Sequence, residues 1–286
     1  MSISPQQKTI VITGCSSGFG RVTALHMAQR GWQVFATVRK EADQESLLSE
    51  AATLRCKEQL TPLICDITSL EQVTTLARTV RAFTSRLDAL LNNAGTTYAA
   101  PMELLAPADL RAQLEINVIA QVAVTQAFMP LLKAAKGTSI NVSSVAGRIA
   151  TPVLGAYAAS KFALEAISDA WRIELAPFGV QVVVIEPDSY ATSIWKTSKD
   201  RALASVEQHR GGPYERLFRA VEKFSDRAAT HGHSPQEFAD TVEKILTSRR
   251  PHTRYVLPRT DIWPILLHQL LPDRLWDRVL RRMLKW

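Results

Sequence analysis

Hydrophobic positions follow two different spacings along most of this chain. Short runs of β-branched and other apolar residues predict strands, and longer stretches with the 3.6-residue period of an amphipathic helix lie between them. We predict strands at residues 9–13, 32–38, 60–65, 87–91, 140–142 and 180–185, and helices at residues 21–30, 43–56, 70–86, 107–134 and 155–176. This alternation predicts an α/β fold, in which helices cover both faces of a parallel sheet and ligands bind at the carboxyl ends of its strands.

The regular pattern lapses beyond residue 187. Residues 188–227 are polar and carry a Gly-Gly-Pro break, which predicts a lid or substrate loop. A helix at residues 235–249 and an edge strand at residues 255–257 follow. Because no linker or repeat interrupts the pattern, we expect one domain at residues 1–258.

The last 28 residues, 259–286, form a tail that such a domain does not require. Its final part repeats apolar residues at helical spacing on one face and arginines on much of the remainder, and an apolar cluster that begins at Ile262 precedes it. The pattern predicts either a cover over the substrate cleft or a partner subunit, or a helix that makes peripheral contact with an anionic membrane.

Composition narrows the class of partner. The chain has 286 residues, of which 46% are hydrophobic and 21% charged, an ordinary soluble composition. The net charge of +7 permits an anionic ligand or an acidic membrane surface. No basic run carries interleaved aromatic residues, so we expect no nucleic-acid partner.

The cysteines and the N-terminal residues indicate in which cellular compartment we expect the protein. Cys15, Cys56 and Cys65 lack the spacing of a metal site or a disulfide framework, so we expect no metal and a reducing environment. The N-terminus has no signal-like segment, and no apolar run reaches the roughly 18 residues of a membrane-spanning helix. We expect a cytoplasmic protein, or one on a cytosolic membrane face.

Three groups that could move one proton lie between Asn141 and Lys161. Tyr157 and Lys161 stand four residues apart, so a helix would bring them to one face. A nearby ammonium would favour the phenolate and lower the pKa of the tyrosine from its usual value near 10. Ser144 follows a predicted strand, where its hydroxyl could polarise a carbonyl oxygen.

A glycine turn after the first strand predicts a dinucleotide site. Gly14, Gly18 and Gly20 stand between a predicted strand and a predicted helix, so a pyrophosphate could rest on backbone N–H groups at the helix start. Arg39 stands near the position where an NAD-binding chain places an acid. Its guanidinium could pair with a 2′-phosphate, which favours NADP(H) and leaves NAD(H) as the alternative.

Together these motifs resemble those of the short-chain dehydrogenase/reductase family over about two thirds of the chain. The glycine turn resembles its coenzyme motif, and the run Asn92-Asn93-Ala94-Gly95 resembles the motif that supports its central sheet. The resemblance implies a Rossmann-type doubly wound sheet and an oxidoreductase. The sequence is most similar to the hydroxysteroid and retinol dehydrogenase branch.

The resemblance also implies roles for individual residues. Tyr157 would be the general acid in carbonyl reduction and the base in alcohol oxidation, while Ser144 holds the substrate oxygen. Lys161 would lower the pKa of Tyr157 and bind the nicotinamide ribose, and Asn117 would hold the water that leads protons from Lys161 to solvent. The cofactor-binding residues that it implies, besides Tyr157 and Lys161, are Gly14, Ser16, Ser17, Gly18, Phe19, Gly20, Arg39, Asp66, Ile67, Asn93, Ala94, Gly95, Pro187 and Thr192.

One departure from the family pattern concerns Asp188, which follows Pro187 where the family usually has glycine. A carboxylate beside the nicotinamide would alter cofactor affinity or substrate choice.

These patterns predict an NADP(H)-dependent enzyme that interconverts a secondary alcohol and a ketone, or a primary alcohol and an aldehyde, on a lipophilic steroid- or retinoid-like substrate or another bulky carbonyl compound. Two alternatives are a non-catalytic NADP(H)-binding sensor, which should have lost at least one catalytic residue, and a sugar-nucleotide epimerase or dehydratase on the same fold, whose glycine spacing and length usually differ. The long helices at residues 107–134 and 157–176 predict a homodimer or homotetramer.

Overall fold

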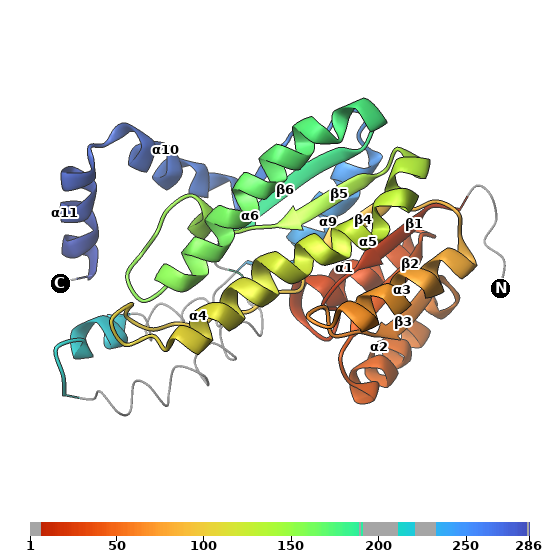
Figure 1. The fold of residues 1–286 in the computed structure, drawn as a ribbon, viewed down its shortest axis with the longest axis horizontal. Coiled ribbons are helices and arrows are strands. Elements are labelled where there is room, and N and C mark those ends of the chain that lie inside the picture. Colours follow the sequence, from red (N-terminus) through yellow and green to blue (C-terminus); the bar gives the residue numbers. More distant parts are fainter. Residues whose placement is uncertain (1–6, 189, 191–210, 221–232, 285) are drawn as a thin grey trace.

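Seven strands form one parallel sheet in the order β3-β2-β1-β4-β5-β6-β7 (Figure 1). The computed structural model describes residues 7–188, 190, 211–220, 233–284 and 286. The strands are β1 (Thr9–Ile12), β2 (Gln33–Val38), β3 (Leu60–Ile64), β4 (Ala89–Asn92), β5 (Thr138–Val142), β6 (Gln181–Pro187) and β7 (Arg254–Leu257). The predicted doubly wound sheet is confirmed. Its order reverses between β1 and β4, the point at which such sheets bind ligands.

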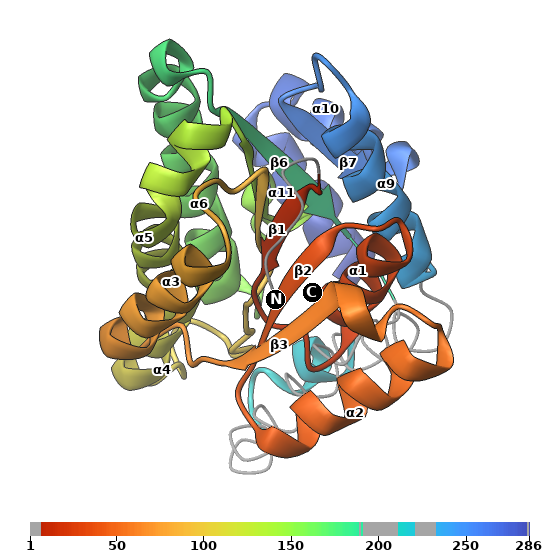
Figure 2. The ribbon, with the colours of Figure 1, turned by 90° about the vertical axis from the view of Figure 1, so that its right-hand side faces the viewer.

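Helices cover both faces of the sheet (Figure 2). On one face lie α1 (Gly18–Gln29), α2 (Glu41–Thr53) and α9 (Pro235–Thr247), and on the other lie α3 (Leu70–Phe83), α4 (Pro107–Leu114), α5 (Ala120–Ala135) and α6 (Gly155–Glu174). Each face has its own apolar core, with Leu47 and Phe238 buried in the first and Val80 and Phe128 in the second. Burial on both faces explains why the central strands β1 and β4 are mostly apolar rather than alternating.

The predicted helix at residues 107–134 consists of three consecutive segments, because a π-helical turn, η2 (Glu115–Ile119), joins α4 to α5. The whole run Pro107–Ala135 is long and apolar enough to cross a membrane, which corrects the expectation that no run approaches that length. Its apolar side chains have another explanation, because α5 buries Val124, Phe128 and Leu132 in the core.

Beyond β7 the chain passes through η5 (Arg259–Asp261) into α10 (Ile262–Leu270) and α11 (Asp273–Leu284), which extend from one end of the sheet domain (Figure 1). Ile265 and Trp276 of these helices are buried in a small cluster with Ile149. Other side chains of α10 are largely exposed, since Trp263 keeps 70% and Leu270 81% of its surface accessible to solvent. The predicted lid at residues 188–227 lies mostly outside the described residues.

Candidate active site

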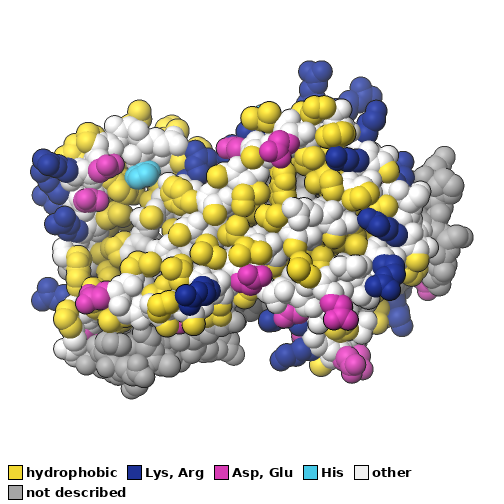
Figure 3. All heavy atoms as spheres, viewed as in Figure 1, with side chains coloured by type: hydrophobic (Ala, Val, Ile, Leu, Met, Phe, Trp, Pro, Cys, Tyr) yellow, Lys and Arg dark blue, Asp and Glu magenta, His cyan; other side chains and the backbone are white. Residues whose placement is uncertain are grey.

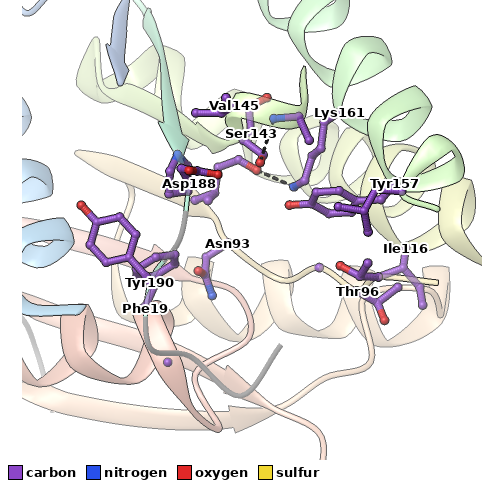
Figure 4. A pocket seen from close by; sticks show the side chains of 18 of the residues that line it. Phe19, Asn93, Thr96, Ile116, Ser143, Val145, Tyr157, Lys161, Asp188 and Tyr190 are labelled. Carbon is purple, nitrogen blue, oxygen red and sulfur yellow. Dashed lines mark hydrogen bonds between the residues drawn. The ribbon is translucent and has the colours of Figure 1, made fainter. Parts of the chain in front are cut away.

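A cavity of about 1040 Å³ runs from the turn after β1 to the inner sides of α10 and α11. Most of the predicted site residues line it, although they come from distant parts of the chain (Figure 4). Those that line it are Gly14, Ser16, Ser17, Gly18, Phe19, Arg39, Asp66, Ile67, Asn93, Ala94, Gly95, Ser144, Tyr157, Lys161 and Pro187. The volume is at the upper end for small-molecule sites, so the cavity can hold a dinucleotide and a substrate together.

The turn between β1 and α1 needs two of its glycines for space. Gly14 has φ +73°, and a Cβ there would lie 2.9 Å from the Cα of Ala94. A Cβ on Gly20 would lie 2.3 Å from the Gly14 carbonyl oxygen, so α1 can approach β1 only without a side chain at this position. The turn thus leaves the N-terminus of α1 open beside the cavity, as a pyrophosphate group requires.

Asn93 ties this turn to the end of β4. Its Nδ2 donates to the carbonyl oxygens of Thr13 (2.8 Å) and Gly14 (3.1 Å). In return, Thr13 Oγ1 accepts from the backbone N–H groups of Asn93 and Ala94, both at 3.0 Å. The carboxyl ends of β1 and β4 are therefore fixed against each other at the point where the sheet order reverses.

Arg39 and Asp66 border the cavity at the ends of β2 and β3. Burial opposes ionisation of Asp66, but hydrogen bonds from Thr68 and the positive charge of Arg39 hold its pKa below the usual range. The Asp66 carboxylate accepts from the backbone N–H (3.0 Å) and the hydroxyl (2.8 Å) of Thr68. Arg39 itself is exposed at the cavity wall, where its guanidinium could contact a phosphate.

Ser144, Tyr157 and Lys161 meet beyond β5. Ser144 caps the short 3₁₀ turn η3 (Val145–Gly147), because its Oγ accepts from the Ala146 N–H at 3.1 Å. Tyr157 and Lys161 lie on α6, and the Lys161 Nζ stands 5.6 Å from the centre of the Tyr157 ring. Figure 4 shows the Tyr157 hydroxyl pointing into the open space that Asp188 borders on the other side.

The pKa of Tyr157 is raised in this structure, whereas the helical spacing to Lys161 predicted a lowered value. Burial raises the pKa of Tyr157 to about 12, a hydrogen bond with the Ser144 side chain opposes the rise, and the negative charge of Asp188 adds to it. Lys161 instead donates from Nζ to the Val142 carbonyl oxygen at 2.7 Å. The helical spacing predicted that Tyr157 and Lys161 lie close together, but it could not predict how far both side chains are withdrawn from water.

Lys161 is 4% exposed. Burial lowers its pKa to about 8, and the negative charge of Glu165, one helical turn further along α6, opposes this fall. A buried amine with a pKa near neutrality can both hold and release a proton at physiological pH.

Two predicted residues in the described part of the chain do not line the cavity, and a third lies outside the described residues. Gly20 lies behind the turn that it allows to form, and Thr192 lies outside the described residues. Asn117 is fully buried within η2, where its Oδ1 accepts from the Thr96 N–H (2.8 Å) and its Nδ2 donates to Ser160 Oγ (3.0 Å). Its side chain is therefore engaged in holding the segment after β4 against α6.

Sequence reasoning missed Ser143, which lies at the cavity wall next to Ser144. Its Oγ is buried and has no hydrogen-bond partner among the described residues. A buried hydroxyl without a partner is costly, and a polar ligand group in the cavity would satisfy it. The repeated serine after a predicted strand was the signal that could have found it.

An aromatic stack behind the glycine turn was also missed. The Phe19 ring lies 4.2 Å from the Phe238 ring, in a stacked arrangement, and 5.1 Å from the Tyr190 ring, edge to face. Tyr190 donates from its hydroxyl to Glu237 Oε2 at 2.9 Å. The stack joins the cofactor end of the cavity to the segment after β6 and to α9.

The tail forms the far wall of the cavity. Its lining residues there are apolar, namely Trp263, Pro264, Leu267, Trp276, Val279, Leu280, Met283 and Leu284. They continue an apolar strip that begins beside Ser144 with Val145 and Ile149. The end of the cavity beyond Tyr157 therefore suits a lipophilic molecule.

Comparison with known proteins agrees with this geometry. The family model described as short chain dehydrogenase matches residues 8–202. The chain is 34% identical to retinol dehydrogenase 5 of Mus musculus, over 98% of this chain and 89% of that protein. It is 31% identical to an NADPH-dependent 3-dehydrocapnine reductase of Ornithobacterium rhinotracheale, over 96% of each. A solved short-chain dehydrogenase from Streptomyces avermitilis superposes with a TM-score of 0.76 at 26% identity, over 97% of this chain and 98% of that one.

Proposed function

This chain belongs to the short-chain dehydrogenase family, and from that premise we propose that it is an NADP(H)-dependent oxidoreductase acting on a lipophilic alcohol or carbonyl compound. The observation that carries the proposal is the continuity of the cavity. It joins the glycine turn, the Ser144–Tyr157–Lys161 group and the apolar wall of the tail in one space. The substrate would be a secondary alcohol or ketone, or a primary alcohol or aldehyde.

The residues around the glycine turn fit a nicotinamide dinucleotide. Gly14 and Gly20 leave the N-terminus of α1 open for the pyrophosphate, and Asp66 and Ile67 would border the adenine ring. Arg39 would pair with a 2′-phosphate, which supports NADP(H) over NAD(H). When bound, the nicotinamide would supply or accept the hydride.

The protein's part in the reaction is to hold the substrate oxygen and move one proton. In the reducing direction Tyr157 would donate its phenolic proton to the carbonyl oxygen as that oxygen gains negative charge, while the Ser144 hydroxyl donates a hydrogen bond to it. Lys161 would then return a proton to the Tyr157 oxygen, and in the oxidising direction each transfer reverses. The apolar wall would exclude water from the reacting carbon.

The substrate class rests on the lining of the far end of the cavity. Trp276, Val279 and Leu280 of α11 line this end of the cavity, and Ile149 packs with Trp276 in the same apolar cluster. The name of the retinol dehydrogenase relative agrees with a lipophilic substrate. The same helices present arginines and exposed apolar residues outward (Figure 3), which supports peripheral contact with an anionic membrane surface in the cytoplasm.

An NADPH absorbance assay tests the function directly. Purified protein would be given NADPH and a panel of aldehydes and ketones that runs from small polar compounds to retinoid and steroid carbonyls. We expect turnover to rise with substrate hydrophobicity. Tight NADPH binding without turnover on any member would favour the sensor, and turnover confined to small polar carbonyls would contradict the substrate class.

We also propose that the chain pairs with a second copy through η2 and α6. Their exposed hydrophobic side chains include Ile119, Phe162 and Ile173, of which Ile173 is 71% exposed. Apolar side chains are conspicuous on this face of the molecule (Figure 3). Light scattering at micromolar concentration tests the proposal, and a monomer would contradict it.

A further inference from the structure

A cluster of charged side chains lies next to Lys161 but does not line the cavity. Arg254 of β7 is at its centre, since its Nε lies 3.0 Å from Glu165 Oε2 and 3.3 Å from Glu186 Oε1. Glu186 Oε1 also accepts from Arg148 Nη1 at 3.1 Å. The two glutamates are nearly withdrawn from water, with Glu165 6% and Glu186 0% exposed.

These residues join the elements that carry the candidate catalytic group. Glu165 lies one turn after Lys161 on α6, Glu186 is the residue before Pro187 on β6, and Arg148 directly follows the turn that Ser144 caps. Arg254 therefore links α6 and β6 directly to the edge strand, and Glu186 extends the cluster to Arg148 in the loop after Ser144.

Gly147 shows how closely the cluster packs against the catalytic lysine. A Cβ at Gly147 would lie 3.2 Å from the Cγ of Glu165 and 3.3 Å from the Cβ of Lys161. The loop after Ser144 therefore lies directly on the segment of α6 that bears both charges. Because Gly147 has no side chain, Glu165 and Lys161 can pack against this loop without a steric clash.

One buried oxygen of each glutamate has no hydrogen-bond partner in the described part of the chain, namely Glu165 Oε1 and Glu186 Oε2. A buried carboxylate that is only half satisfied is costly. This cost of burying a glutamate carboxylate would have a purpose if its negative charge stabilised the charged form of a neighbouring buried group. On α6 that group is Lys161.

We propose that Glu165 is a positioning residue that keeps the buried Lys161 ammonium charged, and that Arg254, Glu186 and Arg148 hold its carboxylate in place. The catalytic role of Lys161 rests on the proposed function. The charge state of Lys161 can be measured whether or not the protein has that function. Glu165 raises the pKa of Lys161 against the larger effect of burial, which is the direction that this arrangement requires.

Other charged and titratable groups lie around the cluster, and a test has to separate their effects on Lys161 from that of Glu165. Asp169 lies one turn further along α6, and its Oδ1 is 2.8 Å from Arg254 Nη2 and 2.7 Å from Arg172 Nη2. Its side chain is 44% exposed. Asp169 is thus a carboxylate on the same helix and the same arginine, but further from Lys161. On the cavity side the groups are Tyr157 and Asp188.

The test is a titration of Lys161 itself by NMR, in the cofactor-free protein labelled with ¹³C at lysine Cε. Lys161→Met identifies its resonance. We expect Glu165→Gln to move the midpoint of that titration downward by roughly one pH unit, because an opposite charge is lost nearby. Asp169→Asn, the matched control, should leave the midpoint within about 0.3 units of wild type.

The outcomes separate cleanly. An unchanged midpoint in Glu165→Gln, or an equal fall in Asp169→Asn, would overturn the proposal. If Glu165→Gln does not fold, Glu165→Met removes the same charge with an apolar side chain of similar size, and an unchanged midpoint there would likewise count against the proposal. Because the titration needs neither cofactor nor turnover, an inactive protein that still shows the shift would contradict only the proposed function.

Discussion

At the scale of single residues, Tyr157 carries the proton chemistry of the proposed reaction. Replacing Tyr157 by Phe removes the hydroxyl and keeps the ring. We expect turnover to fall by the roughly 10²–10⁴-fold typical of general acid–base catalysis, or further, with the cofactor dissociation constant nearly unchanged. Steady-state rates and a fluorescence titration with NADPH measure the two quantities. Near-native turnover would disprove the assignment of Tyr157.

Lys161 gives the protein a characteristic dependence of stability on pH. Burial lowers its folded-state pKa from 10.5 to about 8, so the unfolded chain binds more protons than the folded protein between these values. The destabilisation is complete below pH 8 and disappears as the pH rises toward 10.5. Lys161→Met should therefore be more stable than wild type near pH 7, and the difference should shrink by roughly 3 kcal/mol by pH 10.5.

Urea unfolding of both proteins at several pH values measures this difference. Groups other than Lys161 titrate in both chains and cancel in the comparison. A difference that stays constant, or grows as the pH rises, would show that the Lys161 pKa is not lowered in the folded protein.

The choice between dinucleotides depends on Val38 and Arg39 at the end of β2. Val38→Asp together with Arg39→Ala replaces an attraction for a 2′-phosphate by a repulsion, and supplies an acceptor for a 2′-hydroxyl. We expect the ratio of kcat/KM for NADPH to that for NADH to fall by at least about tenfold. A wild-type enzyme that already prefers NADH would show that Arg39 has another role.

Individual motif residues could be placed from the sequence because parallel strands bring their carboxyl ends to one edge. Asn93 and Ser144 follow different strands yet line the same cavity. The charged cluster could not be foreseen in the same way. Arg148, Glu165, Glu186 and Arg254 come from four segments, and only the three-dimensional fold shows that their charges share a water-poor space.

At the scale of elements, α9 supports the cofactor turn through the aromatic stack. Phe238 is fully buried and stacks on Phe19, which lines the cavity. Phe238→Ala should cost about 3–5 kcal/mol of stability and raise the KM for NADPH several-fold, because Phe19 loses the ring that holds it.

Phe128 provides the control, since it is equally buried in the core of the opposite sheet face. Phe128→Ala should cost a similar stability and leave the KM for NADPH unchanged. Thermal unfolding and cofactor kinetics of the two variants separate packing from positioning. Equal effects of the two substitutions on the KM for NADPH would show that the aromatic stack does not support the cofactor site.

Element type followed from the spacing of apolar residues, but the local geometry did not. The spacing of apolar residues at 107–134 predicts one amphipathic helix and gives no sign of the π-helical turn at η2. Within that turn, Asn117 makes tertiary hydrogen bonds to the segment after β4 and to α6. Such hydrogen bonds join residues that are 21 and 43 positions apart.

At the scale of the whole molecule, the tail can act inward on the substrate or outward on a membrane. Trp276 is 8% exposed and lines the cavity, whereas Leu270 is 81% exposed. We expect Trp276→Ala to raise the KM for a lipophilic substrate several-fold without changing vesicle binding. Leu270→Glu should weaken sedimentation with anionic vesicles and leave turnover in detergent unchanged.

Deletion of residues 261–286 combines the two effects and tests the division of the chain at residue 258. A deletion variant with wild-type turnover and wild-type vesicle binding would reject both roles of the tail.

The position of the last residue has a practical consequence for handling the protein. The Trp286 ring stacks on Tyr214 at 5.9 Å, and the Tyr214 hydroxyl donates to Glu103 Oε2 at 2.5 Å. A purification tag fused after Trp286 would extend from this contact, next to helices that line the cavity. β1 begins at the opposite end of the molecule (Figure 1), so an N-terminal tag leaves that region undisturbed. Activities measured with the two tags should differ most for the bulkiest substrates.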